Sequence, residues 1–337
     1  MLSISKYISH AFSFTPPECV PEDAAGHSIL QHNMPDDEDM DCEEGKRKKL
    51  THCPAAHPSC LFLGKARKPV RVSDWESWFS QFIGEPIPAL VPLGKQQQVC
   101  ACGRHVIDEY GDHVHTCKKH TGSTKAAHET VLDAVEALCH QAGLSTERRN
   151  IPTVKKQNGK TGQGDLLIKG ADIGGDTNLI IDVALIHEFG GNHMADVSLN
   201  GALRNAQPDK LLEAAARTKV HRYREAYATR PGVTYAFLPC VISTSGRIHG
   251  EFLRFLYILA QRRTKRWFEQ LGPHDPSDEA FKFRRGQYFW HTRAAIGHAT
   301  ALAVARRALV AEHTLPTTAP LNCCMTLGRL WVRRATA

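Results

Sequence analysis

The segment CACGRHVIDEYGDHVHTC, residues 100–117, restricts the fold of this chain more than any other stretch. Structural zinc sites use four Cys or His side chains in a tetrahedron, and short spacers bring the ligands at the two ends of a turn together. The segment offers four such ligands: Cys100, Cys102, His113 and Cys117. Three nearby histidines are alternatives to His113: His105, His115 and His120. The spacing predicts a zinc knuckle, and the alternative is a set of unligated thiols.

The cysteine count and the apolar runs limit the compartment. Eleven Cys in 337 residues is an odd number spread over a long chain, which favours reduced thiols and a metal site over a disulfide framework. No run approaches the roughly 18 apolar residues of a membrane-spanning helix, and the N-terminal MLSISKYISHAFSF contains polar residues throughout. We therefore expect an intracellular protein with neither a membrane span nor a secretory signal.

The first 70 residues are predicted to form a disordered arm. They lack sustained hydrophobic periodicity, and they contain the acidic run PDDEDMDCEEG directly before GKRKK. The four basic residues from Lys46 to Lys49 are either a nuclear localisation signal or a solvated charge run. The first interpretation predicts a nuclear protein.

Hydrophobic periodicity predicts an α/β fold from residue 71 onward. Residues 71–122 hold an aromatic helix and the knuckle, because WESWFSQF places its Trp and Phe residues at helical spacing. Residues 123–245 form the core. Its predicted elements are, in order, a helix over 125–142, strands over 165–169 and 178–186, a helix over 209–229 and a strand over 233–243. This order indicates a central mixed sheet flanked by helices, and a basic helical region over 246–337 follows it.

Asp165 and Asp182 are the first candidate catalytic residues. Asp165 opens the strand DLLIK and Asp182 lies in LIIDVAL, with sixteen residues between them, so a hairpin would place the carboxylates side by side. Asp182 shares a strand face with the apolar Ile180 and Ala184, where an Asp is seldom structural. Magnesium held by paired carboxylates lowers the pKa of water and stabilises a phosphodiester transition state. The alternative is a structural pair, in which Asp165 caps a strand and Asp182 bonds a neighbouring backbone group.

This pattern resembles the PD-(D/E)XK nucleases, with Gly164-Asp165 in place of Pro-Asp and Ala184 in place of the motif's Lys. The helix over 209–229 offers a substitute for that Lys. One stripe of the helix carries residues at i, i+4, i+7 and i+11: Leu212, Ala216, Lys219 and Tyr223. Lys219 is therefore expected to point toward the sheet. The alternative is an aliphatic stem that lies along the core and holds its ammonium group in solvent.

Taken in order, CACG, YGDHVHTC, TKAAHETVLDAV, QGDLL, LIIDVAL and KVHRY resemble a known family over about residues 95–245. The family is the C-terminal zinc knuckle and restriction-like endonuclease domain of early-branching, site-specific non-LTR retrotransposons. The resemblance implies that Asp165 and Asp182 bind the metal and that Lys219 is the displaced catalytic Lys. It also implies that Tyr223 positions substrate or water.

The same resemblance assigns a role to His128, on the inward face of its helix, and offers Glu129 as a weaker candidate for an upstream acid. In this family the domain nicks target DNA to free a 3′ hydroxyl that primes reverse transcription. The sequence has no Tyr-x-Asp-Asp motif of a reverse transcriptase. We therefore expect a fragment, a decayed copy or a stand-alone descendant, with any polymerase supplied in trans.

The C-terminal region is predicted to contact DNA, or alternatively RNA. Residues 246–310 contain twelve Lys or Arg against five Asp or Glu, with aromatic residues between the basic clusters. Phosphate contacts and base stacking use such side chains. The candidates are Arg247, Arg262, Arg263, Lys265, Arg266, Arg284 and Arg285. An ordinary amphipathic helical layer is the alternative interpretation.

Two other hydrolase motifs are incomplete. The GKT at 159–161 has Val154 where a phosphate-binding loop requires Gly, and HEFGG at 187–191 has Gly191 where a zinc protease requires its second His. The sequence therefore predicts a DNA endonuclease that uses magnesium or manganese and carries a structural zinc. The main alternative is an inactive nucleic-acid-binding remnant that keeps the zinc and the basic surface.

Overall fold

The computed structural model describes residues 71–155, 159–173, 176–193, 200–230, 233, 235–272 and 276–313. The predicted arm over 1–70, with its basic run, and residues 314–337 of the C-terminal region lie outside the described residues. No helix in the described part of the chain is both long enough and apolar enough to cross a lipid bilayer.

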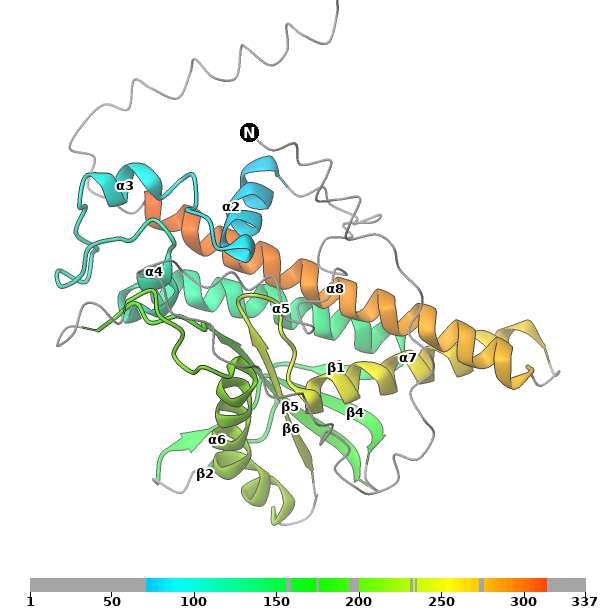
Figure 1. Cartoon of the computed structure of the whole chain (residues 1–337). Coiled ribbons are helices and arrows are strands. Elements are labelled where there is room, and N and C mark those ends of the chain that lie inside the picture. The colour runs from blue at the N-terminus through cyan, green and yellow to red at the C-terminus, as the bar shows by residue number, and fades with distance from the viewer. Residues whose placement is uncertain are drawn as a thin grey trace, which may run out of the picture. The chain divides into compact units, whose positions relative to one another are not determined.

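A four-stranded mixed sheet lies at the centre of the core (Figure 1). In sheet order, its strands are β1 (Ser145–Glu147), β4 (Leu166–Ile173), β5 (Asp176–Ile186) and β6 (Ala236–Ser243). β4 is antiparallel to both β1 and β5, whereas β5 and β6 are parallel. A parallel pair needs a crossover, and α6 (Pro208–Ala228) supplies it. The short strands β2 (Val154–Lys155) and β3 (Thr161–Gly162) form a separate pair. The prediction of an α/β protein with a mixed sheet is confirmed.

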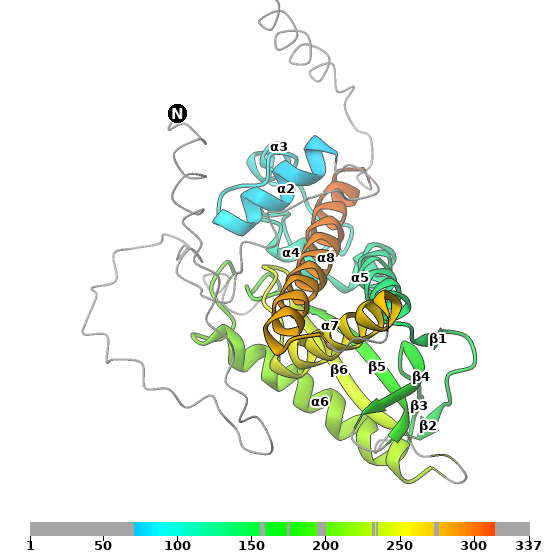
Figure 2. The same ribbon diagram turned by 90° about the vertical axis from the view of Figure 1, so that its right-hand side faces the viewer.

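Helices cover both faces of this sheet (Figure 2). One face packs on α5 (Thr121–Gln141) and α7 (Gly250–Leu271), through alternate residues of β5 such as Ile181 and Val183. The opposite face packs on α6, where Ile180 meets the aromatic side of the helix. Because side chains alternate along a strand, Asp182 faces α6 together with Ile180 and Ala184. The strand periodicity alone predicted this orientation.

A long helix, α8 (Asp278–His313), connects the core with the N-terminal elements. It packs along α5, α7 and α2 (Val72–Ile83). Trp78 of α2 is buried against small residues of α8, and the neighbouring aromatic side chains pack around it. The aromatic stripe is therefore core, as predicted. The remaining elements are α3 (Val91–Lys95), α4 (Asp112–Thr116) and the 3-10 turn η3 (Lys118–His120).

Some predicted boundaries differ from the structure. α5 begins at Thr121, four residues before the predicted start at Lys125, and β6 begins at Ala236 rather than at Val233. Within its described residues, the helical region predicted over 246–337 consists of two helices, α7 and α8. α7 ends at Leu271 because Gly272 follows with φ of 126°, a conformation that favours glycine.

Candidate metal centres

The predicted ligands of the knuckle lie together. The ligand atoms of Cys100, Cys102, His113 and Cys117 are all within 4.8 Å of one another. The sulfurs of Cys100 and Cys117 are 3.8 Å apart, and Nε2 of His113 is 3.5 Å from the sulfur of Cys102. Three of the four side chains are buried. The cluster could hold a metal ion such as zinc, which takes this donor set in structural sites.

The other histidines of the segment have different contacts. Nε2 of His115 is 3.1 Å from Oε1 of Gln81, and the ring of His105 lies beside that of His113 with 4.6 Å between centroids. Nε2 of His120 is 3.2 Å from the sulfur of Cys100, so this ring contacts the cluster without belonging to it. Of the histidines predicted as alternatives, none replaces His113 in the cluster.

The loop after β5 fixes the imidazole of His113. Nδ1 of His113 is 2.8 Å from the carbonyl oxygen of Gly191, in the HEFGG segment. Such a bond holds a metal-binding imidazole in one tautomer and orientation. Gly191 is needed here because a Cβ would collide with the backbone of Asp112 and His113. The near-match to a zinc protease motif is thus a loop that packs on the knuckle.

The C-terminal helix also holds the knuckle. The buried guanidinium of Arg307, in α8, donates to the carbonyl oxygens of Val114 and His115 at 3.1 and 3.0 Å. These carbonyls belong to α4, and a cation at a helix C-terminus is electrostatically favourable. Burial lowers the pKa of Arg307 to about 10, which still leaves the side chain charged at neutral pH.

The predicted carboxylates meet where β4 begins. Asp165 immediately precedes β4, and its N–H donates to the Ile181 carbonyl of β5 at 2.8 Å. Gly164 lies so close to β5 that a Cβ there would collide with Ile180 and with the Ile181 carbonyl. Its N–H donates to the hydroxyl of Tyr227, a bond that Pro could not make. The departure from Pro-Asp therefore has a local structural reason.

Each carboxylate has a cationic partner. Nε2 of His128 is 3.0 Å from Oδ2 of Asp165, and the N–H of Val183 donates to the same oxygen at 2.6 Å. Nζ of Lys219 donates to Oδ1 of Asp182 at 2.8 Å. The predicted inward direction of Lys219 is confirmed.

Asp182 is a buried acid with only one of its carboxylate oxygens hydrogen-bonded. Its side chain is 7% exposed, and its second oxygen, Oδ2, is buried and accepts no hydrogen bond. Burial raises the pKa of Asp182 to about 6, with a smaller contribution from the charge of Asp165. A buried oxygen without a donor is costly, and a cation would satisfy it.

Other predicted residues lie near this pair in different roles. Glu129 binds Arg148, with Oε2 3.2 Å from Nη1, and Oε1 is 3.9 Å from Nδ1 of His128. Tyr223 is buried in an aromatic cluster with Tyr227 and Phe237. Among the described residues, the knuckle is the one cluster with three or more metal-type ligands. The carboxylate site thus offers two protein ligands rather than four.

Tyr227 is a contributor that the sequence reasoning missed. Its hydroxyl accepts the Gly164 N–H at 2.9 Å and donates to the carbonyl oxygen of Pro152 at 2.9 Å. It therefore ties α6 to the residue before Asp165. The helical stripe through Lys219 and Tyr223 reaches Tyr227 one turn later, and extending it would have found this side chain.

The predicted basic surface is largely engaged within the protein. Arg262 donates to the Ala171 carbonyl at 2.5 Å, and Arg263 donates to Oε1 of Gln141 at 2.7 Å. Arg266 lies near the Gln141 carbonyl, where it meets the C-terminal end of α5. These three side chains join helices and sheet, as the alternative interpretation of a helical layer predicts.

Guanidinium groups also cover aromatic rings that lie between the basic residues. The guanidinium of Arg284 lies 4.0 Å from the ring centroid of Trp267, and that of Arg285 lies 4.9 Å from Tyr257. Cation–π contacts of this kind stabilise α7 against α8. Lys265 is exposed.

Arg247 departs most from its predicted role. It is 4% exposed, and Nη2 lies 3.1 Å from Oδ1 of Asp209. Its Nε is 3.8 Å from the buried carboxylate of Glu188. Because it is buried beside two acids, Arg247 does not lie on a surface that DNA reaches, and its place in the predicted interface is wrong.

Comparisons with known proteins add no assignment. No family model matches this sequence, and no curated protein matches it. The function is therefore argued from the geometry of the two centres.

Proposed function

We propose that this chain is a metal-dependent DNA endonuclease that nicks one strand by phosphodiester hydrolysis. The observation that carries the proposal is the pairing of Asp165 with Asp182, whose buried Oδ2 has no hydrogen-bond donor while Lys219 bonds Oδ1. Two neighbouring carboxylates and a lysine suit phosphodiester chemistry.

Asp165 and Asp182 would hold magnesium or manganese. Magnesium is commonly bound by one or two carboxylates together with water and substrate phosphate oxygens, so two protein ligands are sufficient. When bound, the ion would supply activation of water and neutralisation of charge on the phosphate. The raised pKa of Asp182 fits such a ligand, because the buried carboxylate gains most when a cation arrives.

The surrounding residues would prepare the site. Lys219 would stabilise the charge that develops on the phosphate oxygens or orient the attacking water. His128 would orient Asp165 through the contact of its Nε2 with that carboxylate at 3.0 Å, which also raises the pKa of the imidazole. Tyr223, which belongs to α6, would act through its packing in the aromatic cluster with Tyr227 and Phe237.

The resemblance to the retrotransposon endonuclease domain supports the same conclusion. The mixed sheet flanked by helices, the preceding zinc knuckle and the helix that carries Lys219 agree with what it implies. By the same resemblance, the partner would be DNA, with RNA as the alternative, and a reverse transcriptase would be supplied in trans. The basic run from Lys46 to Lys49, as a nuclear localisation signal, would place the protein in the nucleus. Exposed Lys265 would add a phosphate contact.

A second candidate is an inactive nucleic-acid-binding remnant with a structural zinc. One observation favours it: His128 and Lys219 already pair with the two carboxylates, so both are partly neutralised without a metal ion. A remnant would bind DNA in a salt-sensitive manner that magnesium does not alter.

Nicking of supercoiled plasmid by the zinc-loaded protein separates the two. The wild type should convert plasmid to open circle in magnesium or manganese, and Asp182→Asn should not. Asp278→Asn, a matched change at an exposed Asp of α8, should nick like wild type. If wild type binds DNA but does not nick it, or if Asp182→Asn nicks normally, the endonuclease proposal fails.

A further inference from the structure

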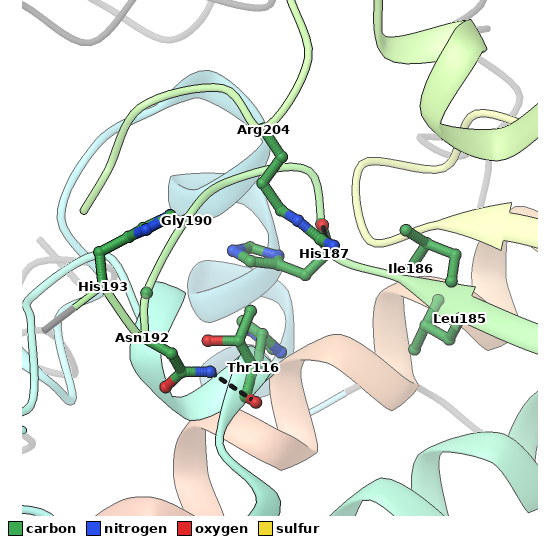
Figure 3. Close-up of a pocket in the computed structure, with 10 residues that line it drawn as sticks. Thr116, Leu185, Ile186, His187, Gly190, Asn192, His193 and Arg204 are labelled. Carbon is green, nitrogen blue, oxygen red and sulfur yellow. Dashed lines mark hydrogen bonds between the residues drawn. The ribbon is translucent and has the colours of Figure 1, made fainter. Parts of the chain in front are cut away.

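A cavity of about 340 Å³ lies where the knuckle meets the end of β5 (Figure 3). His115 and Thr116 of α4 form one wall. The last two residues of β5 and the following HEFGG loop form the second wall, and Arg204 closes the third side. None of these residues belongs to the candidate catalytic set.

The walls are held by bonds that cross between elements. His187 lies between two buried partners, with Nε2 2.8 Å from Oδ1 of Asp112 and Nδ1 2.8 Å from Oγ1 of Thr244. Asn192 donates to the Thr116 carbonyl at 2.7 Å, the bond drawn in Figure 3. Knuckle, β5 and β6 are thus tied together around the cavity, which gives it a fixed shape.

The chemistry of the lining favours an anion. Within the part of the chain that the structure describes, no Asp or Glu lines the cavity, whereas Arg204, three histidines, an Asn and a Thr do. Both ring nitrogens of His187 are already bonded, so Arg204 is the main donor toward a ligand. Arg204 is exposed, and it donates from Nη1 to the His187 carbonyl at 3.1 Å, with its side chain above the His187 ring in Figure 3. A guanidinium has five donors in a planar fork that matches the oxygens of a phosphate. The bond to His187 uses one of them.

The position of the cavity connects it with the carboxylates. Ile186 lines the cavity and follows Asp182 by four residues in the same strand. Four residues of strand span about 13 Å, which equals about four steps of a DNA strand at 3.4 Å of helix axis each. The separation between Asp182 and the cavity therefore matches a few nucleotides of a DNA strand.

We infer that this cavity is a subsite for a backbone phosphate of the DNA strand, bound by Arg204 a few nucleotides from the scissile bond. The assignment rests on the proposed endonuclease function for the identity of the strand. The histidine side chains and the Gly190–Gly191 backbone form the floor on which the phosphate lies.

Binding of a fluorescein-labelled duplex tests this subsite. The full-length, zinc-loaded protein is used without added magnesium, so that cleavage does not interfere, and anisotropy is followed over a series of salt concentrations. Arg204→Ala should weaken binding about tenfold at moderate salt and reduce the salt slope by about one counterion, while Arg204→Lys keeps the slope. Arg254→Ala is the matched control, because Arg254 is also exposed and has one ionic partner, Glu251.

The outcomes are distinguishable from those of the nicking experiment. If Arg204→Ala and Arg204→Glu bind the duplex with wild-type affinity and slope, the subsite is wrong even where the protein nicks through Asp182. If binding depends on Arg204 in a protein that does not nick, the subsite stands and the endonuclease proposal fails. If 5′-dAMP binds through Arg204 while duplex binding does not depend on it, the cavity serves a free nucleotide and the inference is overturned.

Discussion

The two candidate metal centres of this protein are built in opposite ways. The knuckle takes four ligands from residues 100–117, and all four ligand atoms lie within 4.8 Å. The carboxylate site takes His128 from α5, Asp182 from β5, Lys219 from α6 and Asp165 from the position just before β4, and it leaves Oδ2 of Asp182 without a donor. A closed set of four ligands is typical of structural metal sites, and an open set is typical of catalytic ones. The difference supports a structural role for the first centre, and under the proposed function the second would share its metal with substrate.

Removal of the metal from the knuckle should have the largest effect. Metal binding to Cys and His ligands contributes directly to folding, and here α8 and the HEFGG loop both pack on the segment. We expect Cys100→Ser, or treatment with a strong zinc chelator, to lower the thermal midpoint by more than about 10 °C. Differential scanning fluorimetry with zinc re-addition measures this. An unchanged thermal midpoint in chelator would show that a metal at the knuckle does not stabilise the fold, and the described difference between the two centres would then be wrong.

Loss of Lys219 should reduce nicking with little effect on folding. Lys219→Ala removes the ammonium that bonds Asp182, and we expect nicking to fall about a hundredfold. The fold should persist, because the Lys219 side chain is one-quarter exposed. Initial rates of plasmid nicking provide the measurement, with Arg217→Ala on the exposed side of α6 as control. Equal rates for Lys219→Ala and the control would remove Lys219 from the site.

The carboxylate site should respond to pH near 6. Burial raises the pKa of Asp182 in the folded state from 3.8 to about 6, so protons compete with a metal below that pH. Nicking should fall as the pH is lowered through about 6. Because the pKa of Asp182 is higher in the folded state, the neutral carboxyl of Asp182 stabilises the fold. This contribution to the free energy of unfolding is complete below about pH 3.8 and is lost as the pH rises through about 6.

A pH series with wild type and Asp182→Asn checks the predicted pH dependence of nicking and that of stability. Nicking is measured in wild type, and urea unfolding is measured in both proteins. In Asp182→Asn, the part of the pH dependence of the free energy of unfolding that comes from Asp182 should be absent. An identical profile in the two proteins would contradict the raised pKa.

The smallest predicted effect concerns Tyr227. Tyr227→Phe leaves the Gly164 N–H and the Pro152 carbonyl without their partner and should destabilise the protein by about 1–3 kcal/mol. Nicking should decrease severalfold, because Asp165 follows Gly164. Urea denaturation and nicking rates measure both, with Tyr235→Phe as the control. Wild-type values for Tyr227→Phe would show that the hydroxyl does not hold Asp165.

The contrast between the centres also explains what the sequence could predict. The knuckle could be predicted from the sequence because its ligands are near neighbours in the chain. Asp182 and Lys219 were placed correctly because strand and helix periods fix which face each side chain takes. These predictions depend on local geometry alone.

Long-range contacts were beyond such reasoning. Arg262 meets the Ala171 carbonyl and Arg307 meets Val114, over separations of 91 and 193 residues, and no local pattern encodes either contact. Arg247 was wrong for the same reason, since its acidic partners come from α6 and from the loop after β5. A basic residue in a sequence does not reveal whether an acid or a carbonyl elsewhere in the fold already binds it.

Manganese binding to the zinc-loaded protein tests the central claim most directly. Free and bound Mn²⁺ can be counted by electron paramagnetic resonance in wild type, Asp182→Asn and the control Asp278→Asn, with zinc measured in parallel. We predict a manganese site that wild type and the control share and that Asp182→Asn loses, with zinc retained in all three. Equal manganese binding in Asp182→Asn and wild type would contradict the assignment of an open metal centre to Asp165 and Asp182.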